Sequence, residues 1–470
     1  MVEPRVVVVG AGPAGVRCAE ALASAGIRPT LVDENRRDGG QIYRRQPENF
    51  ARSYAKLYGT EASRAAAIHS SFEKLRGQID YLPQTLVWNI EGRNLYLVRD
   101  ARHITLTFDA LVLATGATDR LMPVKGWNLS GTYSLGGAQV ALKSQACAIG
   151  ADVVFAGTGA LLYLVAAQYQ RAGARVRAVL DTAPWSDRVG ALRDLFAVPA
   201  TLLKGLLLTF ALRRAGVPVY TGIEPLEIVG TGAKGVSGIS FKDSRGRTVD
   251  MECDAVALGY HLRPETQLAD LARCEFYFDP ATRQWLPQVD PDGRSSVAGV
   301  YLTGDGARVR GAAAAEKSGE LAALAVLQDL GRAPDLDAMR ALRRSLETFD
   351  HFARGLNQAF PWPSGQAARL SDDTIVCRCE SVSVGELRQV VQQAGARESN
   401  RAKAFSRVGM GRCQGRYCGH AAAEIIAHAA NVPIEKVGRL RAQAPVKPLH
   451  IATVQNADEA RSNASVEGVR

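Results

Sequence analysis

Four cysteines near the end of the chain are the residues best suited to bind a metal centre. Cys377 and Cys379 form one close pair, and Cys413 and Cys418 form a second pair after 33 intervening residues. Four thiolates in two pairs can hold a [2Fe–2S] cluster or a tetrahedral zinc ion. The C-x-C and C-x-x-x-x-C spacings differ from the C-x-x-C pairs of zinc ribbons, and the glycines around the second pair suit backbone N–H donation to cluster sulfur. The pattern favours a [2Fe–2S] cluster, with zinc and an empty site as alternatives.

A glycine-rich motif for binding a dinucleotide opens the chain. The run Gly10-Ala11-Gly12-Pro13-Ala14-Gly15 directly follows four consecutive valines. The first glycine permits a tight turn, the second lets a pyrophosphate approach the backbone, and the third lets helix and strand pack closely. An acid about 20 residues further on binds the ribose hydroxyls in such units. Asp33 is the first candidate for this acid and Glu34 the alternate.

A similar motif lies in the middle of the chain. Gly157 and Gly159 follow an apolar run over residues 151–156, and Asp181 ends the next predicted strand. This arrangement predicts a second βαβ unit nested inside the first. Leu162 occupies the position of the third small residue, where it would hold the helix away from the strand and crowd a pyrophosphate. NAD(P), another nucleotide and no ligand at all are therefore all open for this unit.

Alternating strands and helices must position these motifs. For the first unit, apolar runs and helical periodicity predict a strand over residues 6–9, a helix over 14–25 and a strand over 28–32. Two later apolar strands each end in a turn of small residues, Thr115-Gly116 and Gly304-Asp305, and a helix is expected from about 311 to 330. Strands that alternate with helices in this way predict an α/β fold.

Composition and charge exclude several classes of protein. The chain has 470 residues, of which 47% are hydrophobic and only 22% charged, so it can bury several cores and is not disordered. Its formal net charge is +10, but pairs such as Arg36-Arg37 are scattered among acidic residues instead of forming a stripe. We therefore expect no nucleic acid as a partner. No close pair of redox cysteines precedes residue 377, which argues against a thiol–disulfide mechanism.

The N-terminal sequence and the most apolar stretch bear on localisation. No secretory signal is visible at the N-terminus. The apolar stretch 195–212 contains Pro199, Lys204 and Gly205, which are costly or disruptive in a bilayer, so a packed helix is expected there. We expect a cytoplasmic protein, with peripheral association at the inner face of the membrane as the alternative.

The order of the motifs resembles that of glutathione-reductase-like flavoproteins, which contain two nested dinucleotide-binding domains. In that class the first glycine motif holds the ADP half of FAD, and the later segments lie along the rest of the cofactor. The resemblance implies FAD contacts from Gly10, Gly12, Pro13, Ala14, Gly15, Asp33, Glu34, Gly40, Gln41, Val87, Thr115, Gly116, Gly304 and Asp305. In the second unit, Gly157, Gly159 and Asp181 would contact a second nucleotide.

The four-cysteine segment resembles the module of bacterioferritin-associated ferredoxin (BFD). It shares the C-R-C-E opening and the M-G-R-C-Q-G-x-x-C-G close. Its second pair departs from the C-x-x-C of the free-standing ferredoxin but matches copies that are fused to flavoproteins. Between the pairs, Ser383 and Glu386 predict a capping box at the start of a helix. The resemblance implies that all four cysteines bind a [2Fe–2S] cluster.

Together these features predict an α/β protein with two nested Rossmann-like domains, glutathione-reductase-like, and a small α-rich BFD-like [2Fe–2S] domain. The expected domains are 1–125 with 254–330 for FAD, 126–253 for the second nucleotide-binding-like fold, 331–370 for a helical linker, 371–440 for the cluster and 441–470 for an extended tail.

Over its whole length the chain resembles the FAD-containing large chain of heteromeric amino-acid and opine dehydrogenases, of the opine-oxidase, D-hydroxyproline-dehydrogenase and hydrogen-cyanide-synthase types. The motifs that carry this resemblance are Gly39 to Arg44, the nested glycine motif, the cysteine module and Ala444 to Pro448. In those complexes a partner chain of the D-amino-acid-oxidase type oxidises the substrate at its own flavin. Some of them also contain a small third subunit or an FMN at the interface, and a quinone or another carrier accepts the electrons.

The resemblance therefore implies an electron-transfer subunit with FAD and [2Fe–2S], and an oxidoreductase acting on an amino acid, imino acid or opine only as part of a complex. No residue of the chain is expected to act as acid or base. Two alternatives stand beside this interpretation. One is a self-sufficient NAD(P)H-dependent oxidoreductase, and the other is a non-redox assembly protein with structural flavin and zinc.

Overall fold

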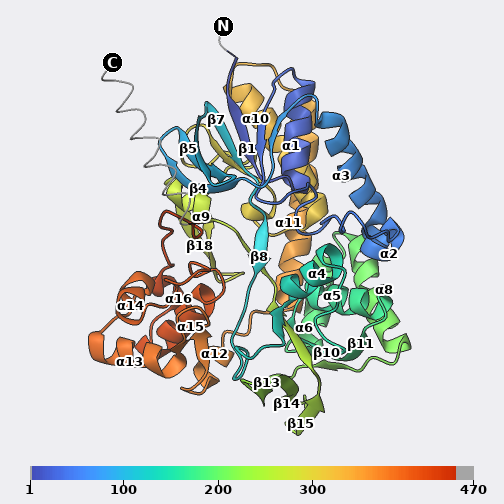
Figure 1. The fold of residues 1–470 in the computed structure, drawn as a ribbon, viewed down its shortest axis with the longest axis vertical. Coiled ribbons are helices and arrows are strands. Elements are labelled where there is room, and N and C mark those ends of the chain that lie inside the picture. Colours follow the sequence, from blue (N-terminus) through green and yellow to red (C-terminus); the bar gives the residue numbers. More distant parts are fainter. Residues whose placement is uncertain (1–2, 451–470) are drawn as a thin grey trace.

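A computed structural model describes residues 3–450 of the chain (Figure 1). Two α/β domains are stacked along the long axis, and a small helical module lies beside the lower one. Within the described residues, no helix combines the length and apolarity needed to cross a bilayer. The predicted fold class, two nested Rossmann-like domains with a small α-rich module, is confirmed.

The first domain is built on a five-stranded parallel sheet of order β20-β7-β1-β2-β3. Its strands are β1 (Val6–Val9), β2 (Thr30–Val32), β3 (Asp80–Leu82), β7 (Ala110–Leu113) and β20 (Val300–Leu302). The all-valine β1 is buried on both faces, as the central strand of a parallel sheet requires. One face packs against helices α1 (Pro13–Ser24), α3 (Ala62–Leu75) and α10 (Ala312–Asp329).

The other face of this sheet packs against an antiparallel sheet and a short helix. These elements are β4 (Leu86–Glu91), β5 (Asn94–Arg99), β6 (Arg102–Thr107) and α9 (Gln267–Leu271). Smaller elements complete the domain: α2 (Tyr54–Tyr58), η1 (Gly59–Glu61), β18 (Phe276–Asp279), β19 (Gln284–Pro287) and η2 (Gly304–Gly306). The predicted strands and helices of the first unit are thus confirmed to within two residues.

The second domain repeats the parallel arrangement, with strand order β12-β11-β10-β16-β9. Its sheet contains β9 (Thr132–Ser134), β10 (Asp152–Thr158), β11 (Arg175–Asp181), β12 (Val219–Thr221) and β16 (Ala255–Tyr260). Its helices are α4 (Leu135–Ser144), α5 (Ala160–Arg171), α6 (Trp185–Gly190), α7 (Leu192–Leu195) and α8 (Pro199–Arg214). An antiparallel sheet of β13 (Glu224–Thr231), β14 (Gly235–Lys242) and β15 (Thr248–Glu252) lies at its far end (Figure 1).

Two connections join the domains. The antiparallel pair of β8 (Ala117–Asp119) and β17 (Leu262–Pro264) carries the chain into the second domain and back. The segment expected as a linker contains α11 (Leu336–Ala359), which packs against α10, α6 and α7 and so spans both domains. This helix is amphipathic, and its apolar face is buried, which explains why it packs on the domains instead of extending between them.

The C-terminal module contains a two-stranded sheet and short helices. Its elements are α12 (Gln366–Arg369), β21 (Ile375–Cys377), β22 (Val382–Ser383), α13 (Val384–Ala394), α14 (Ser399–Ser406), α15 (Gly419–Ala430) and α16 (Ile434–Val437). The predicted capping box is confirmed: Ser383 accepts a hydrogen bond from the Glu386 backbone, and the Glu386 side chain accepts one from Ser383 N–H.

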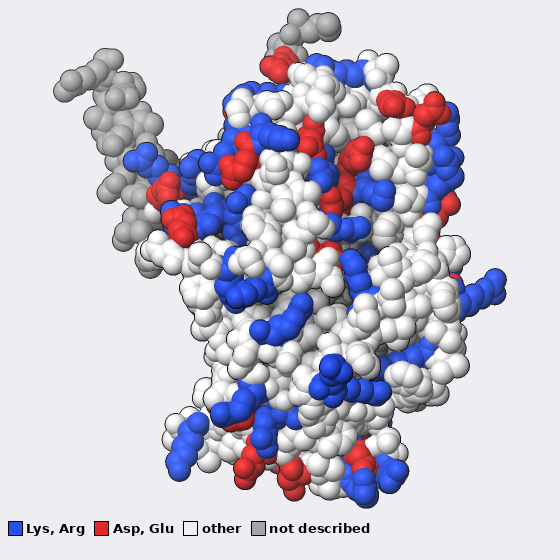
Figure 2. Space-filling view, turned by 90° about the vertical axis from the view of Figure 1, so that its right-hand side faces the viewer, with Lys and Arg blue, Asp and Glu red and all other residues white. Residues whose placement is uncertain are grey.

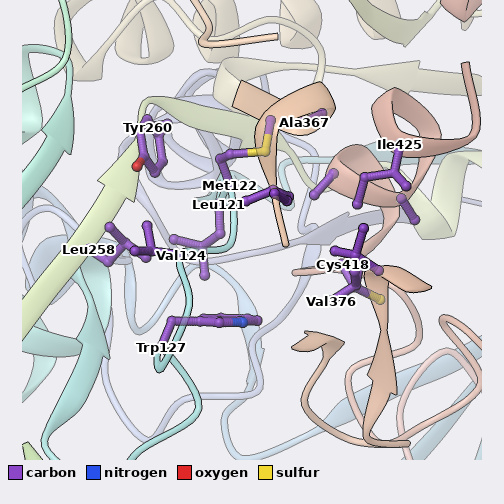
Figure 3. Close-up of a cluster of buried hydrophobic side chains, with 14 of the residues drawn as sticks. Leu121, Met122, Val124, Trp127, Leu258, Tyr260, Ala367, Val376, Cys418 and Ile425 are labelled. Atoms are coloured by element: carbon purple, nitrogen blue, oxygen red, sulfur yellow. The ribbon is translucent and has the colours of Figure 1, made fainter. Parts of the chain in front are cut away.

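The module is fused to the second domain through one continuous apolar core. Figure 3 shows Leu121, Met122 and Trp127 lying between the sheet residue Leu258 on one side and the module residue Ile425 on the other. The Trp127 indole N–H donates to the carbonyl oxygen of Ile375 at 2.5 Å. Because the core runs across the boundary, the cysteine loops are held rigidly against the flavoprotein part.

Candidate functional site

The turn between β1 and α1 has the geometry required to hold a pyrophosphate. Gly10 has φ +110°, and a Cβ there would lie 2.3 Å from the carbonyl oxygen of Ala114. A Cβ at Gly15 would lie 1.7 Å from the carbonyl oxygen of Gly10, so only glycine fits. No side chain among the described residues caps α1, whose first residue is Pro13. The positive end of this helix is therefore available to an anion.

This turn opens into a cavity of about 1980 Å³. The cavity is lined by all but one of the residues predicted to contact FAD: Gly10, Gly12, Pro13, Ala14, Asp33, Glu34, Gly40, Gln41, Val87, Thr115, Gly116, Gly304 and Asp305. The exception is Gly15, which lies behind the turn where helix and strand meet. Segments from β1, β2, β4, β7 and β20 thus converge on one space, which fits an extended dinucleotide.

The two candidate ribose acids, Asp33 and Glu34, differ in burial and in their partners. Asp33 is buried, and its carboxylate accepts hydrogen bonds from Ala11 N–H at 2.6 Å and from the backbone and side-chain amides of Asn35. Burial raises the pKa of this carboxyl group. Glu34 is half-exposed and pairs with Lys447 from the C-terminal segment. Both line the cavity, so the choice between them as the ribose ligand stays a prediction.

Asp305 is held at the end of β20 by the loop that follows it. Its Oδ1 accepts hydrogen bonds from the backbone N–H groups of Arg310 at 2.8 Å and Gly311 at 3.0 Å. Burial raises the pKa of this carboxyl group. The residue lies in the cavity wall beside Gly304, where Ser318 fixes the backbone by accepting from Gly304 N–H. The geometry suits a carboxylate that receives hydroxyl groups of the cofactor chain.

The structure brings all four predicted cluster cysteines together. Cys418 hydrogen-bonds to Cys377 and Cys413, and Cys413 also contacts Cys379. The hydrogen bond from Cys418 lowers the pKa of Cys377 to about 6 and that of Cys413 to about 5, whereas the same contacts raise the pKa of Cys418. Burial raises the pKa of Cys379. The thiolate is the form of cysteine that ligates iron.

Backbone donors surround these sulfur atoms. The N–H groups of Cys379, Glu380 and Gly409 donate to Cys377, and those of Gly415 and Tyr417 donate to Cys413. Within residues 3–450 no three His, Cys, Asp or Glu side chains are arranged so that they could hold one metal ion. Four neighbouring thiols with many backbone N–H donors would fit a [2Fe–2S] cluster, which is held by four cysteine thiolates.

The cluster loops and the dinucleotide turn line the same cavity, which the sequence did not predict. Cys379 and Cys413 contribute to its wall together with Arg378, Arg412, Arg416 and Tyr417. The helix α11 also contributes residues to the wall: Glu347, Asp350, His351, Arg354 and Asn357. Only the folding of residues more than 300 positions apart creates this shared space, so no local pattern signals it.

The first part of the expected C-terminal tail also belongs to the site. Val446 is buried in the core of the first domain, and its N–H donates to the carbonyl oxygen of Trp88 at 3.2 Å. Lys447, Pro448 and Leu449 line the cavity. The segment up to residue 450 is therefore extended but packed, and the rest of the predicted tail lies outside the described residues.

In the second nucleotide motif, other groups of the chain bind the acidic residue. The Asp181 side chain is fully buried, and its carboxylate accepts from Thr158 Oγ1 and Tyr163 OH, each at 2.7 Å, and from Arg188 Nη2 at 2.5 Å. Its Oδ1 also accepts from Ala183 N–H at 2.9 Å. None of Gly157, Gly159 and Asp181 lines the cavity. These contacts leave the acid no free position for a ribose.

Aromatic side chains lie over this filled motif. The Arg188 guanidinium lies 5.2 Å from the ring centre of Tyr163 and 5.0 Å from that of Phe360, which follows α11. His261 hydrogen-bonds to the carbonyl oxygen of Phe360. Leu162 is fully buried in the core between α5 and the sheet. Phe360, which follows α11, thus packs on the side chains that surround Asp181, whereas Ala160 and Leu161 at the start of α5 line the cavity.

Comparison with known proteins agrees with this geometry. Residues 4–326 match the pyridine nucleotide-disulphide oxidoreductase family, and residues 375–428 match the BFD-like [2Fe-2S] binding domain. An opine oxidase subunit of Rhizobium meliloti is 37% identical over 95% of this chain and 86% of its own length. The HcnB subunit of hydrogen cyanide synthase from Pseudomonas aeruginosa is 30% identical over 96% of this chain and 98% of its own.

Solved structures share the fold. L-proline dehydrogenase from P. horikoshii superposes with a TM-score of 0.68 at 18% identity, covering 96% of this chain and 79% of that one. Thioredoxin reductase from T. acidophilum superposes with a TM-score of 0.52 over 70% of this chain and 98% of that one, at 22% identity. The chain therefore belongs to the pyridine nucleotide-disulphide oxidoreductase family, as a member that binds FAD and carries a BFD-like [2Fe–2S] domain at its C-terminal side.

Proposed function

We propose that the chain is the electron-transfer subunit of a heteromeric dehydrogenase, and that a partner chain oxidises an amino acid, imino acid or opine at its own flavin. The observation that carries this proposal is the single cavity lined both by the FAD residues and by Cys379 and Cys413. The names of two relatives, subunits of opine oxidase and of hydrogen cyanide synthase, support a multi-subunit context.

The chain's own residues hold the two redox groups. When bound, FAD takes up electrons in pairs and a [2Fe–2S] cluster passes them on singly. The uncapped end of α1 receives the pyrophosphate, and Asp305 orients the cofactor chain. Cys377, Cys379, Cys413 and Cys418 supply the thiolates for the cluster. The helix α11 and the segment around Val446 form part of the wall of the cavity.

An exposed apolar surface on the second domain suits a protein partner. We define this α6–α8 face by its exposed members Trp185, Val189, Leu192, Phe196, Leu203, Leu206, Leu207 and Phe210. Figure 2 faces the side on which α3 and α8 lie and shows a mostly white surface at mid-height, with isolated basic and few acidic residues. Exposed apolar groups concentrated in one region mark interaction sites.

The position of this face relates it to electron entry. Thr201 of α8 lines the FAD cavity, so the α6–α8 face begins at the cavity edge. A catalytic partner of the D-amino-acid-oxidase type that docks here would bring its flavin close to the cavity. The basic residues Arg193, Arg213 and Arg214 in these helices would favour an acidic rim on that partner. A quinone or another electron carrier would be the final acceptor.

Affinity purification tests the partner directly. A tag on this chain in its native host should recover a flavoprotein of the amino-acid-oxidase type in a fixed ratio. The purified complex should reduce a dye acceptor with D-hydroxyproline or with a carboxyethyl-arginine opine, whereas the isolated chain should not. Full activity of the isolated chain with either substrate would overturn the proposal.

A matched pair of surface variants tests the docking face. Phe210 is 63% exposed on α8, and Phe405 is 55% exposed on α14 in the module. Phe210→Glu should release the partner at concentrations where the wild-type complex is intact, as seen by size-exclusion chromatography. Phe405→Glu should leave the complex assembled. Equal retention of the partner by both variants would remove the α6–α8 face from the proposal.

A further inference from the structure

Three buried ion pairs fasten the cysteine module to the flavoprotein part, and one of them differs from the others. In each pair a carboxylate with a side chain no more than 13% exposed accepts hydrogen bonds from an arginine across the boundary. The pairs are Arg283–Glu424, Arg439–Asp270 and Arg416–Glu265. The first two join segments that contain neither a predicted FAD residue nor a cluster cysteine. The third joins the two redox sites.

Glu265 holds the turn on the FAD side of the cavity through its backbone. Its N–H donates to the carbonyl oxygen of Gly116 at 2.9 Å, and its carbonyl oxygen accepts from Thr115 Oγ1 at 2.6 Å. Its side chain points the other way, where the carboxylate accepts from Arg416 Nε at 2.8 Å. One residue thus contacts both the flavin-side turn and the module.

Arg416 lies inside the loop that carries the second cysteine pair. Its Nη1 donates to the carbonyl oxygen of Cys413 at 3.3 Å and to that of Val446 at 2.9 Å. The side chains of Arg416 and Glu265 are only 10% and 13% exposed. Hydrogen bonds between ionised groups in a buried site are strong and fix geometry, so the two loops are held in one register.

A second arginine makes this a charged site as well as a link. Arg263 Nη2 lies 3.7 Å from the Glu265 carboxylate, and Arg263 interacts electrostatically with Cys413 and Cys418. Two guanidinium groups and one carboxylate therefore lie next to the thiolate ligands. The carboxylate offsets one of the two positive charges that act on the cluster ligands.

We infer that Glu265 is a positioning residue: with Arg416 it sets the distance between the FAD-side turn and the cluster, and with Arg263 it tunes the cluster potential. This inference rests on the proposed electron-transfer function. Neutralising Glu265 leaves two uncompensated cations beside the cluster, which favours its reduced, more negative state. The cluster potential should then become more positive, and transfer from the flavin side should slow because the charged side-chain link between this turn and the module is weakened.

The experiment compares Glu265→Gln with Asp270→Asn in the full-length chain loaded with both cofactors. Both variants neutralise a buried carboxylate of the same interface, but Asp270 contacts neither Thr115 nor Gly116 among its hydrogen bonds. The measurements are flavin and iron content, the midpoint potential of the cluster by EPR-monitored titration, and the rate of cluster reduction after photoreduction of the flavin.

We expect Glu265→Gln to keep both cofactors, to shift the cluster potential positively and to slow cluster reduction by roughly tenfold. Asp270→Asn should lower thermal stability while leaving potential and rate near those of the wild type. Glu265→Asp, which retains the charge on a shorter side chain, should restore the potential but not the full rate.

The outcomes separate the two levels of the proposal. If electrons on the flavin never reach the cluster in the wild-type chain, the proposed function fails. If they do, and Glu265→Gln matches Asp270→Asn in both potential and rate, the pair is only a structural fastener and the inference is wrong. Should Glu265→Gln fail to bind FAD or iron, Arg416→Lys tests the same link, with an expected slower rate at an unchanged potential.

Discussion

The two nested βαβ units have the same topology but opposite relations to a ligand. In the first, Gly15 lets α1 pack on β1, and Asp33 faces the cavity. In the second, Leu162 fills the corresponding place in the core, and Asp181 is enclosed by Tyr163 and Arg188. Parallel strands with a crossing helix therefore create a potential nucleotide site, and the side chains at a few positions decide whether it is open.

The largest effect is expected from making the first unit like the second. Gly15→Leu should abolish FAD binding, because even a Cβ at this position would lie 1.7 Å from the carbonyl oxygen of Gly10. The measurement is flavin absorbance per chain after purification, with circular dichroism to confirm folding. Gly205→Ala on α8, where nothing lies near a new Cβ, is the matched control and should retain FAD. A Gly15→Leu chain with full flavin content would show that glycine is not required at this position for FAD to bind.

The reverse change should cost stability without creating a site. Leu162→Gly removes a fully buried side chain and adds a glycine to a helix, for an expected loss of about 3–5 kcal/mol in the free energy of unfolding. NADH should still not bind, because Asp181 keeps its internal partners. Chemical denaturation and calorimetric titration with NADH measure the two quantities. Tight NADH binding by this variant would show that the third motif position alone closes the second unit.

A pH effect is expected from the first unit. His69 is buried beneath the Gly39–Tyr43 loop, hydrogen-bonded to Tyr43 O and Tyr54 OH, and burial lowers its pKa to about 4. The unfolded imidazole binds a proton near pH 6.5, whereas the folded one stays neutral until about pH 4. The free energy of unfolding should therefore fall as the pH drops from about 6.5 to 4, by at most about 1.4 kcal/mol per pH unit.

His69→Gln should flatten this part of the pH profile, whereas the exposed His428→Gln should not. Denaturation midpoints between pH 4 and 7 provide the measurement. An unchanged slope in His69→Gln would assign the acid sensitivity to other groups.

The smallest expected effect concerns the wild-type second unit. NADH or NADPH added anaerobically should leave the flavin absorbance unchanged, since the Asp181 carboxylate is sealed by Thr158, Tyr163 and Arg188. Rapid bleaching of the flavin would favour the alternative function, a self-sufficient NAD(P)H-dependent oxidoreductase. Dithionite, which needs no binding site, serves as the positive control for reduction.

Local patterns predicted those parts of the site that short segments build. The Gly10–Gly15 turn follows from the steric needs of one strand and one helix, and the Ser383–Glu386 capping box from four consecutive residues. The grouping of Cys377, Cys379, Cys413 and Cys418 followed from their types and spacing together with the BFD resemblance. These features depend on backbone geometry and side-chain chemistry that neighbours in sequence already determine.

Other features required the folded chain. The sequence shows Asp181 after a strand, as a ribose ligand would be, but only the packing of α6 and Phe360 brings Arg188 and an aromatic cover to it. In the same way Glu265 and Arg416 are 151 positions apart, and Lys447 reaches Glu34 over 413 positions.

From the sequence we could predict FAD and favour a [2Fe–2S] cluster, because the glycine motifs and the cysteine pairs are built from a few neighbouring residues. Only the folded chain shows that residues of both predicted redox sites line one cavity and that Asp181 of the second motif is bound by other groups of the chain. The physical reason is that burial and ion pairing depend on which surfaces meet, and those surfaces come from segments hundreds of residues apart.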